Sequence, residues 1–394
     1  MLTNKDIITD ANNLYDAYLK SRIDSSWKPQ VKEYRNIYIL QISDLQYKLI
    51  NNKYKSSKGK DFQIHERGKI RFIRSNSFYD RVIRRCFSDN VLVPSLRPHL
   101  IHDNGASLKG KGLSFTRRRF EQHLHEAFRE YGSNDFVVIL IDLSKYYDNI
   151  DHDQLKSEVF HYITDLFSQN LYSEILSNFE VDVSYLPDNV FKNYKYIKFD
   201  LNNWFLIYRT EHCKIKMMKK SCAVGDQCSQ ISGVFHGNSV DQYFKSHLHI
   251  KYYDKHMDDT AILINNKLYA KHLINIADEK YNDIYCFLNR KKTKICKVNK
   301  YFKWLQFNYK VTSTGHIIIK INKTRIVSER RRLKKYKNLY NNGSMSLFDI
   351  QNSYKSWMGS FHKYMSKYQR IRMDILFLNL FGKEIYGKKD NSNV

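Results

Sequence analysis

Proline, glycine and long apolar runs are scarce in this chain. Only 4 of its 394 residues are proline and 14 are glycine, so no long flexible linker is expected. None of the 6 cysteines stands in a Cys-x-x-Cys spacing, which argues against a zinc site and favours reduced thiols. The sequence has neither an apolar stretch of the roughly 18 residues that a membrane span needs nor a signal peptide's apolar core. It therefore predicts a cytoplasmic protein of two or three subdomains without a membrane partner.

Acidic residues are outnumbered by basic ones. The chain has 66 Lys and Arg against 40 Asp and Glu, which gives a net charge of +26 and a pI near 9.6. The excess is densest in residues 290–303 and 330–335. Such an excess indicates a polyanionic partner, because counterion release drives binding to nucleic acids. The alternative for each basic run is an ordinary solvated face.

Two acidic segments predict a site for metal ions. Asp258 and Asp259 follow a short strand-like segment and precede the apolar residues 260–264, which predicts a β-hairpin with acids in its turn. A solvated turn would give the same pattern. A further acid, Asp142, ends the apolar run 136–141, which predicts a strand buried on both faces. Converging carboxylates of this kind would hold two Mg²⁺ ions about 3.5 to 4 Å apart for an in-line displacement at phosphorus.

A third segment lies between these acids in the sequence. Gly225 stands at its start, and the segment running to Asp241 is apolar on one side, which predicts a helix entered through a Gly-containing turn. A glycine there allows the backbone to approach a ligand closely. An ordinary junction between a loop and a helix explains the pattern equally well.

Taken in order, these segments resemble the palm motifs of reverse transcriptases. Residues 141–152 resemble the first motif and Gly225-x-x-x-Ser229-Gln230 the second. Residues 256–259 resemble the third, usually written Tyr-x-Asp-Asp. Residues 288–295 and 302–307 resemble the fourth motif and the primer grip.

The resemblance implies an α+β fold of the right-hand polymerase type. Its parts would be fingers, a palm made of an antiparallel sheet with helices, and a helical thumb. The implied boundaries are 1–135 for the N-terminal region and fingers, 136–300 for the palm, 301–325 for the primer grip and 326–394 for the thumb.

The resemblance also implies a role for each residue of the catalytic centre. Asp142 and Asp258 would hold both Mg²⁺ ions, assisted by Asp259 and the backbone carbonyl of Leu143. Lys292 would protonate the departing pyrophosphate. Tyr147 would lie under the deoxyribose and exclude ribonucleotides.

Further residues are implied to contact nucleotides and nucleic acid. Residues 62–73 predict a basic hairpin, similar to the fingers hairpin of group II intron-like reverse transcriptases; a solvated basic turn is the alternative. Its candidates for contact with a deoxynucleoside triphosphate are Arg67, Lys69 and Arg71, while Gly225, Ser229 and Gln230 would line the templating base pair. The implied contacts with template or primer are Lys109, Lys111, His256, Trp304, Arg331 and Lys334.

The C-terminal part predicts three helices. Gly343 separates the first two, and Gly382 ends the third. Ser346-x-x-Asp349 is an N-cap signature for the second.

Two departures from the family pattern bear on the subfamily. His256 stands where the family generally has Tyr, and Ser229-Gln230 replaces Ser-Pro. Ser-Gln is familiar from diversity-generating retroelement enzymes and from defence-associated, unknown-group bacterial reverse transcriptases. The resemblance therefore implies an RNA-directed DNA polymerase that makes cDNA from deoxynucleoside triphosphates.

The template would be a dedicated noncoding RNA, with DNA as primer or product, in prokaryotic antiphage defence. Two alternatives stay open: a diversity-generating retroelement reverse transcriptase and a catalytically silent RNA-binding relative. Priming by a nucleic acid or by a protein hydroxyl, and a monomer or an oligomer, are all compatible with the sequence.

Overall fold

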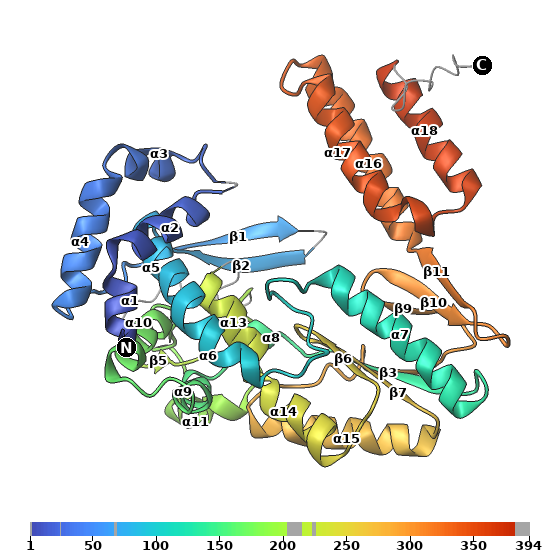
Figure 1. Cartoon of the computed structure of the whole chain (residues 1–394), viewed down its shortest axis with the longest axis horizontal. Coiled ribbons are helices and arrows are strands. Elements are labelled where there is room, and N and C mark those ends of the chain that lie inside the picture. Colours follow the sequence, from blue (N-terminus) through green and yellow to red (C-terminus); the bar gives the residue numbers. More distant parts are fainter. Residues whose placement is uncertain (1, 24, 67–68, 203–214, 223–225, 383–394) are drawn as a thin grey trace. The chain divides into compact units, whose positions relative to one another are not determined.

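The chain folds into helices and antiparallel strands, which confirms the α+β class (Figure 1). The computed structural model describes residues 2–23, 25–66, 69–202, 215–222 and 226–382. Two compact units are formed. The first comprises Met1–Phe120 and Ile139–Ile295, and the second comprises Glu121–Val138 and Cys296–Val394. The finer division into fingers, palm, primer grip and thumb stays a prediction.

The first unit begins with helices and a hairpin. The helices are α1 (Asn4–Thr9), α2 (Ala11–Ser21), α3 (Pro29–Asn36), α4 (Tyr38–Ile50), α5 (Phe78–Phe87) and α6 (Val93–Leu96). Strands β1 (Lys60–Glu66) and β2 (Lys69–Ser75) pair antiparallel, so the predicted basic hairpin is confirmed. Ser77 caps α5 by accepting the amide of Asp80.

A four-stranded sheet carries the acidic segments. Its strand order is β6-β7-β3-β8, where β6 is Tyr253–His256, β7 is Asp259–Ile264, β3 is Val137–Ile141 and β8 is Lys294–Lys297. Every residue of β3 is buried, as predicted for a strand covered on both faces. Strands β6 and β7 form the predicted hairpin, and α15 (Lys267–Asp283) packs on β7.

Seven further helices are formed by the described residues between β2 and β6. They are α7 (Leu113–Tyr131), α8 (Tyr146–Asn149), α9 (His152–Phe160), α10 (Leu166–Ser177), α11 (Asp188–Lys192), α13 (Gln227–His236) and α14 (Asn238–Gln242). The single helix predicted up to Asp241 is wrong, because Gly237 divides it into α13 and α14. A Cβ at Gly237 would lie 3.1 Å from the Lys255 ammonium nitrogen, so glycine permits this close approach.

Residues 181–202 and 215–218 add a small ribbon with a core of its own. Strands β4 (Val181–Asp182) and β5 (Met217–Met218) pair antiparallel. Buried Val183, Phe199 and Leu201 pack with them. No sequence pattern predicted this ribbon.

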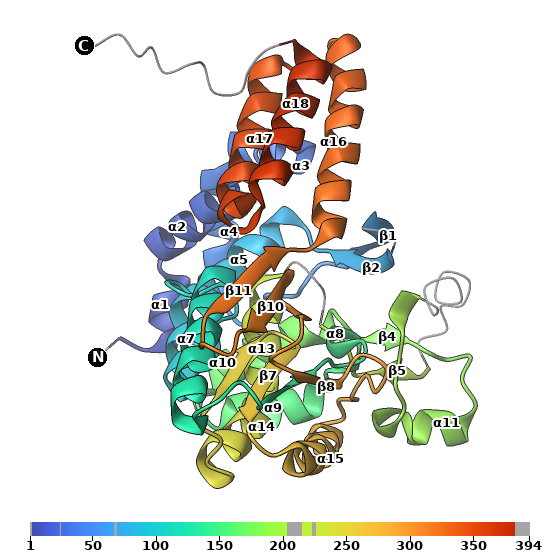
Figure 2. The same ribbon diagram turned by 90° about the vertical axis from the view of Figure 1, so that its right-hand side faces the viewer.

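Besides residues 121–138, the second unit contains a small sheet and three long helices. Its strands are β9 (Phe302–Trp304), β10 (Phe307–Val311) and β11 (Ile317–Ile321), in the order β11-β10-β9. Helices α16 (Lys323–Asn341), α17 (Leu347–Phe361) and α18 (Lys367–Phe381) lie side by side in both views (Figures 1 and 2). Ser346 caps α17, and Gly343 and Gly382 both have a φ of +68°, so the three predicted helix boundaries are confirmed.

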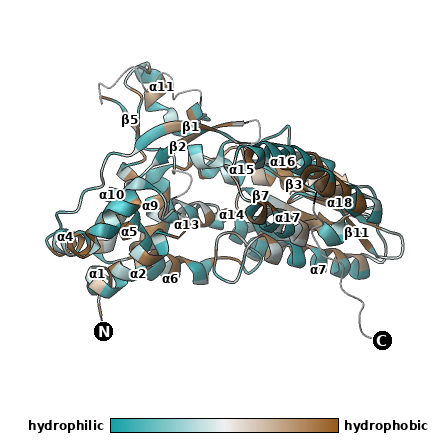
Figure 3. Cartoon of the chain, turned by 90° about the horizontal axis from the view of Figure 1, so that it is seen from above, coloured by the Kyte–Doolittle hydropathy of each residue, from teal (hydrophilic) through white to brown (hydrophobic). Residues whose placement is uncertain are grey.

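These three helices enclose an apolar core. Leu333, Tyr354, Met373 and Phe377 are buried in it. Helix α18 is also apolar on its outer side (Figure 3), where Ile375 is 49% exposed. Within the described ranges, no helix has both the length and the apolarity needed to cross a membrane.

We expect Met373→Ala to lower the free energy of unfolding by about 2 to 5 kcal/mol, because it leaves a cavity in a closed core. Ile375→Ala, on the outer side of the same helix, should change it by less than about 1 kcal/mol. Chemical denaturation followed by circular dichroism measures both. Equal effects would show that α18 does not pack as described.

Candidate active site

Asp142 lies directly after the buried strand β3, and its carboxylate holds a lysine. Both carboxylate oxygens accept from the Lys292 ammonium, at 2.9 and 3.0 Å. The Asp142 carbonyl accepts the Asn289 amide at 2.8 Å, and the Asp142 amide donates to the Thr293 hydroxyl at 3.3 Å. The turn that carries Lys292 is therefore fixed to the end of β3. Two residues that the sequence predicted in one site are in direct contact.

Asp258 lies in the two-residue turn between β6 and β7. His256 pairs with Asp259 as the last rung of the hairpin, so Met257 and Asp258 form the turn. Met257 has a φ of +56°, in the left-handed region that glycine favours. Strain of this kind at a non-glycine residue clusters at functional sites.

The two acids interact through their charges. Burial, followed by the negative charge of Asp142, raises the pKa of the Asp258 carboxyl above its ordinary value. The positive charges of Lys255 and Lys292 lower it in part. Because like charges resist being held together, a cation near both carboxylates stabilises them. Lys292 supplies such a cation to Asp142.

Mg²⁺ matches this site in donor chemistry. Asp142, Asp258 and Asp259 offer the carboxylate oxygens that it prefers. Within the described residues, no three His, Cys, Asp or Glu side chains form a ready metal-binding group. A metal ion would have to replace the Lys292 ammonium at Asp142. Asp259 is half-buried at the start of β7 and Leu143 is buried, and their roles as ligands stay predictions.

The Tyr147 ring lies between α13 and the turn of the hairpin. Its hydroxyl donates to the Met257 sulfur at 3.7 Å. A Cβ at Gly233 would come within 2.8 Å of the ring, so only glycine leaves room for it. Burial raises the pKa of Tyr147, and the charge of Asp258 raises it further. A neutral phenol therefore lies beside the acidic turn.

The N-terminus of α13 is fixed by a carboxylate that the sequence interpretation missed. Asp226 caps the helix by accepting the amides of Cys228 and Ser229 at 2.9 and 3.2 Å. Its other oxygen accepts from Arg84 of α5 at 3.2 Å and from Asn76 at 2.9 Å. An Asp directly before a helical pattern is a recognised N-cap signal, so Asp226 could have been predicted. Its partner Arg84 has no such local signal.

The residues predicted to line the templating base pair lie on or before α13. Ser229 is buried and its hydroxyl has no hydrogen-bond partner among the described residues, while Gln230 is half-buried. Ser229 and Gly233 are four residues apart, so both lie on the helix face toward Tyr147. Gly225 lies outside the described residues.

Only one of the three predicted nucleotide-binding cations can be placed. Arg67 lies outside the described residues, as does the side chain of Lys69. Arg71 is exposed on β2. Burial raises the pKa of Asp148 to about 6, and the charge of Arg71 lowers it in part. The hairpin cation Arg71 and the motif residue Asp148 are thus within electrostatic range.

A loop of residues 103–112 lies against β6. Backbone hydrogen bonds of 3.0 and 3.1 Å join it to Lys255. The Lys111 ammonium donates to two carbonyls, those of His102 at 2.7 Å and Asn104 at 3.1 Å, so this cation holds the loop together. Lys109 is exposed. Contact of Lys109 and Lys111 with nucleic acid stays a prediction.

His256 faces this part of the protein. Its Nδ1 lies 3.0 Å from the Thr116 hydroxyl, and burial lowers its pKa. A Cβ at Gly105 would collide with the same hydroxyl, so glycine lets the loop pass close to Thr116. The predicted contact of His256 with the primer stays a prediction.

The other predicted nucleic-acid contacts belong to the second unit. Arg331 and Lys334 are exposed on α16, where they are accessible to a polyanion. Trp304 is only 4% exposed and belongs to the core of the β9–β11 sheet. Burial of its ring gives no support to the predicted contact with nucleic acid.

A buried ion pair lies directly beneath the hairpin. The Lys255 ammonium is 2.9 Å from Asp241 and 2.7 Å from the Tyr281 hydroxyl, and Tyr253 also donates to Asp241, at 2.6 Å. Although burial opposes the charge of Lys255, Asp241 and Tyr281 raise its pKa, so it stays protonated. The pattern gave no signal for this pair, because a lysine in a strand is normally solvated.

Comparison with solved structures finds remote likenesses. The chain is similar to telomerase from Candida albicans in complex with a fragment of telomeric RNA, with a TM-score of 0.42, 12% identity and 90% of this chain covered. It is similar to apo telomerase from Candida tropicalis, with a TM-score of 0.44, 12% identity and 88% of this chain covered. The shares of those chains covered are 64% and 66%. No protein-family profile and no curated protein matches the sequence. Likenesses this remote assign neither a family nor an activity.

We expect Asp241→Leu to lower the free energy of unfolding by about 3 to 5 kcal/mol, because it leaves a buried ammonium without its carboxylate. The double variant Asp241→Leu with Lys255→Met should recover most of this loss, since it removes both charges. Denaturant unfolding of the two variants and of Lys255→Met completes the cycle. Additive effects of the two single changes would contradict a direct ion pair.

Proposed function

We propose that this protein is an RNA-directed DNA polymerase, a reverse transcriptase that makes cDNA by two-metal nucleotidyl transfer. The observation that carries the proposal is the electrostatic coupling of Asp142 and Asp258. One acid ends a buried strand and the other stands in a strained turn. Such an arrangement serves chemistry better than stability, because two carboxylates whose charges interact repel each other.

Asp142 and Asp258 would hold the metal ions, assisted by Asp259 and the carbonyl of Leu143. When bound, Mg²⁺ supplies positive charge that favours the attacking hydroxyl in its ionised form and stabilises the leaving oxygens. Lys292 would supply the proton that the reaction needs on its leaving group. Once it is released from Asp142, its ammonium can donate a proton to the departing pyrophosphate as general acid.

Tyr147 would select deoxyribonucleotides over ribonucleotides. Its ring has little freedom, because Gly233 backs it on one side and the Met257 sulfur contacts its hydroxyl on the other. A ring held in this way can exclude a 2′-hydroxyl by contact alone. Ser229 and Gln230, on the neighbouring helix, would support the templating base pair.

The template is proposed to be a partner noncoding RNA in prokaryotic antiphage defence. A net charge of +26 supports a polyanionic partner. Exposed cations such as Lys109, Arg331 and Lys334 are available for phosphate contacts. Ser229-Gln230 equally favours a diversity-generating retroelement enzyme, whose gene would stand beside a template repeat and a variable target gene.

We expect Asp142→Asn and Asp258→Asn each to lower DNA synthesis by at least about a hundredfold, since each removes a charge that would hold metal. The assay uses the full chain with Mg²⁺, deoxynucleoside triphosphates and its co-purifying RNA. Asp283→Asn, which changes an exposed acid paired with Lys280, is the matched control. If the unaltered protein makes no DNA from any co-purified or supplied RNA, the polymerase proposal fails.

We expect Tyr147→Ala to raise the use of ribonucleotides relative to deoxyribonucleotides by up to about a hundredfold, the range of discrimination by sterics alone. Gly233→Ala should displace the ring and lower the rate with both substrates. The measurement is the ratio of kcat/KM for matched ribo- and deoxyribonucleotides. An unchanged ratio in Tyr147→Ala would remove this residue as the steric gate.

A further inference from the structure

A basic pocket lies between the C-terminal end of α2, helix α5 and the N-terminus of α13. Its volume is about 290 Å³. The side chains that matter in its lining are Lys20, Arg81, Arg84, Arg85, Asp226 and Gln227. At about 30 Å³ for each water, the pocket has room for a tetrahedral anion with several waters.

Two of these side chains, Arg84 and Asp226, form an ion pair and neutralise each other. Arg84 is 1% exposed and its Nη1 lies 3.2 Å from Asp226. Asp226 also accepts two amides of α13, so both of its oxygens are engaged. Asp80 acts on Arg84 through its charge, but it is hydrogen-bonded to Tyr54 and does not line the pocket.

The remaining cations of the lining outnumber the carboxylates that could neutralise them. Lys20 and Arg85 share a single one, Asp89, at 3.0 and 2.9 Å. Among the described residues, Arg81 forms no ion pair of its own, although the charge of Asp226 acts on it. Its guanidinium donates to the Ser21 carbonyl at 3.1 Å.

Arg81 is therefore an incompletely compensated charge. Burial lowers its pKa, and the charge of Asp226, which Arg84 already pairs with, raises it only in part. Burying a charge is costly unless a counter-charge accompanies it. Among the described residues, four cationic side chains at the pocket meet two carboxylates, Asp89 and Asp226.

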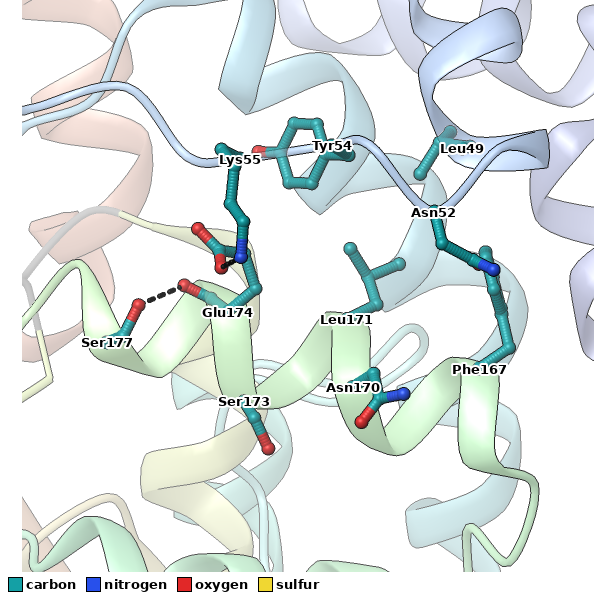
Figure 4. A pocket seen from close by; sticks show the side chains of 10 residues that line it. All are labelled: Leu49, Asn52, Tyr54, Lys55, Phe167, Asn170, Leu171, Ser173, Glu174 and Ser177. Carbon is teal, nitrogen blue, oxygen red and sulfur yellow. Dashed lines mark hydrogen bonds and ion pairs between the residues drawn. The ribbon is translucent and has the colours of Figure 1, made fainter.

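The larger pocket between α4 and α10 differs in this respect. Its volume is about 420 Å³ and its charges are balanced, because Lys55 and Glu174 form an ion pair of 3.0 Å (Figure 4). The rest of its lining consists of amides, hydroxyls and apolar groups. The lining of this larger pocket therefore has no excess positive charge that would favour an anion.

We propose that the pocket at Arg81 binds a phosphate group, supplied by the backbone of the nucleic-acid strand on which the protein acts. Guanidinium groups match phosphate oxygens in geometry, with two parallel hydrogen bonds, and Lys20 adds a rotatable ammonium at the rim. The pocket adjoins Asp226, the cap of the helix that carries Ser229. A strand held here would therefore be fixed close to the start of that helix. The phosphate site itself is independent of the proposed function, whereas the identification of a nucleic-acid strand as the source of the phosphate rests on it.

The test is Arg81→Gln in the full-length protein without metal, so that catalysis plays no part. Binding of a fluorescent single-stranded RNA is followed by anisotropy at several salt concentrations, and binding of inorganic phosphate by calorimetry. Loss of one phosphate contact should weaken RNA binding by about tenfold, or about 1.4 kcal/mol. The slope of log K against log salt should fall in magnitude by about 0.7. Arg35→Gln, which removes an exposed cation of α3, is the control and should change neither.

Each outcome separates the alternatives. Weaker RNA binding with a smaller salt slope supports a strand phosphate, and loss of inorganic phosphate binding alone supports a free phosphate as the source. Unchanged binding of both overturns the site. Should Arg81→Gln unfold, as judged by circular dichroism, Lys20→Gln with Arg85→Gln tests the same pocket at its more exposed side chains. A protein that binds RNA through this pocket but makes no DNA would retain the site while refuting the polymerase proposal.

Discussion

The buried ion pair between Lys255 and Asp241 is the interaction on which the candidate site depends. Lys255 lies on β6, two residues before the hairpin turn. Its ammonium has room beside α13 and α14 because Gly237 has no side chain. Its backbone also holds the loop that passes Thr116. Since a buried ammonium is stable only with its partners in place, the hairpin, α14 and α15 must form together. The position of Asp258 relative to Asp142 is a consequence of that cooperative unit.

A second constraint arises from repulsion between those two acids. The fold holds Asp258 where the charge of Asp142 opposes its ionisation. The Lys292 ammonium offsets part of the Asp142 charge by donating to both carboxylate oxygens. In the proposed function, a metal cation would replace this ammonium, and only the flexible Lys292 side chain would have to move. Lys292, which is about half exposed, can leave Asp142 without disturbing the core.

The sequence was sufficient for features with local signals. The buried strand ending at Asp142, the hairpin around Asp258 and the cap at Ser346 follow from periodicity and turn chemistry over a few residues. The pairs Arg84–Asp226 and Lys255–Asp241 could not be predicted, since their members are distant in sequence and each residue alone looks solvated. Burial of Trp304 was missed for a similar reason, because an aromatic in a basic segment fits a core and a stacking surface equally well.

Helix α13 is held at two points, and in the proposed function this would link template contact to sugar selection. Its N-terminus is tied to α5 through Asp226 and Arg84, and one turn beyond Ser229 the absence of a side chain at Gly233 admits the Tyr147 ring. Because Ser229 and Gly233 share a face, a small shift or rotation of the helix moves both together. A phosphate bound beside Arg84 would act on the first of these points. If a strand binds at the pocket as proposed, its binding and the placement of Tyr147 would be coupled through this one helix.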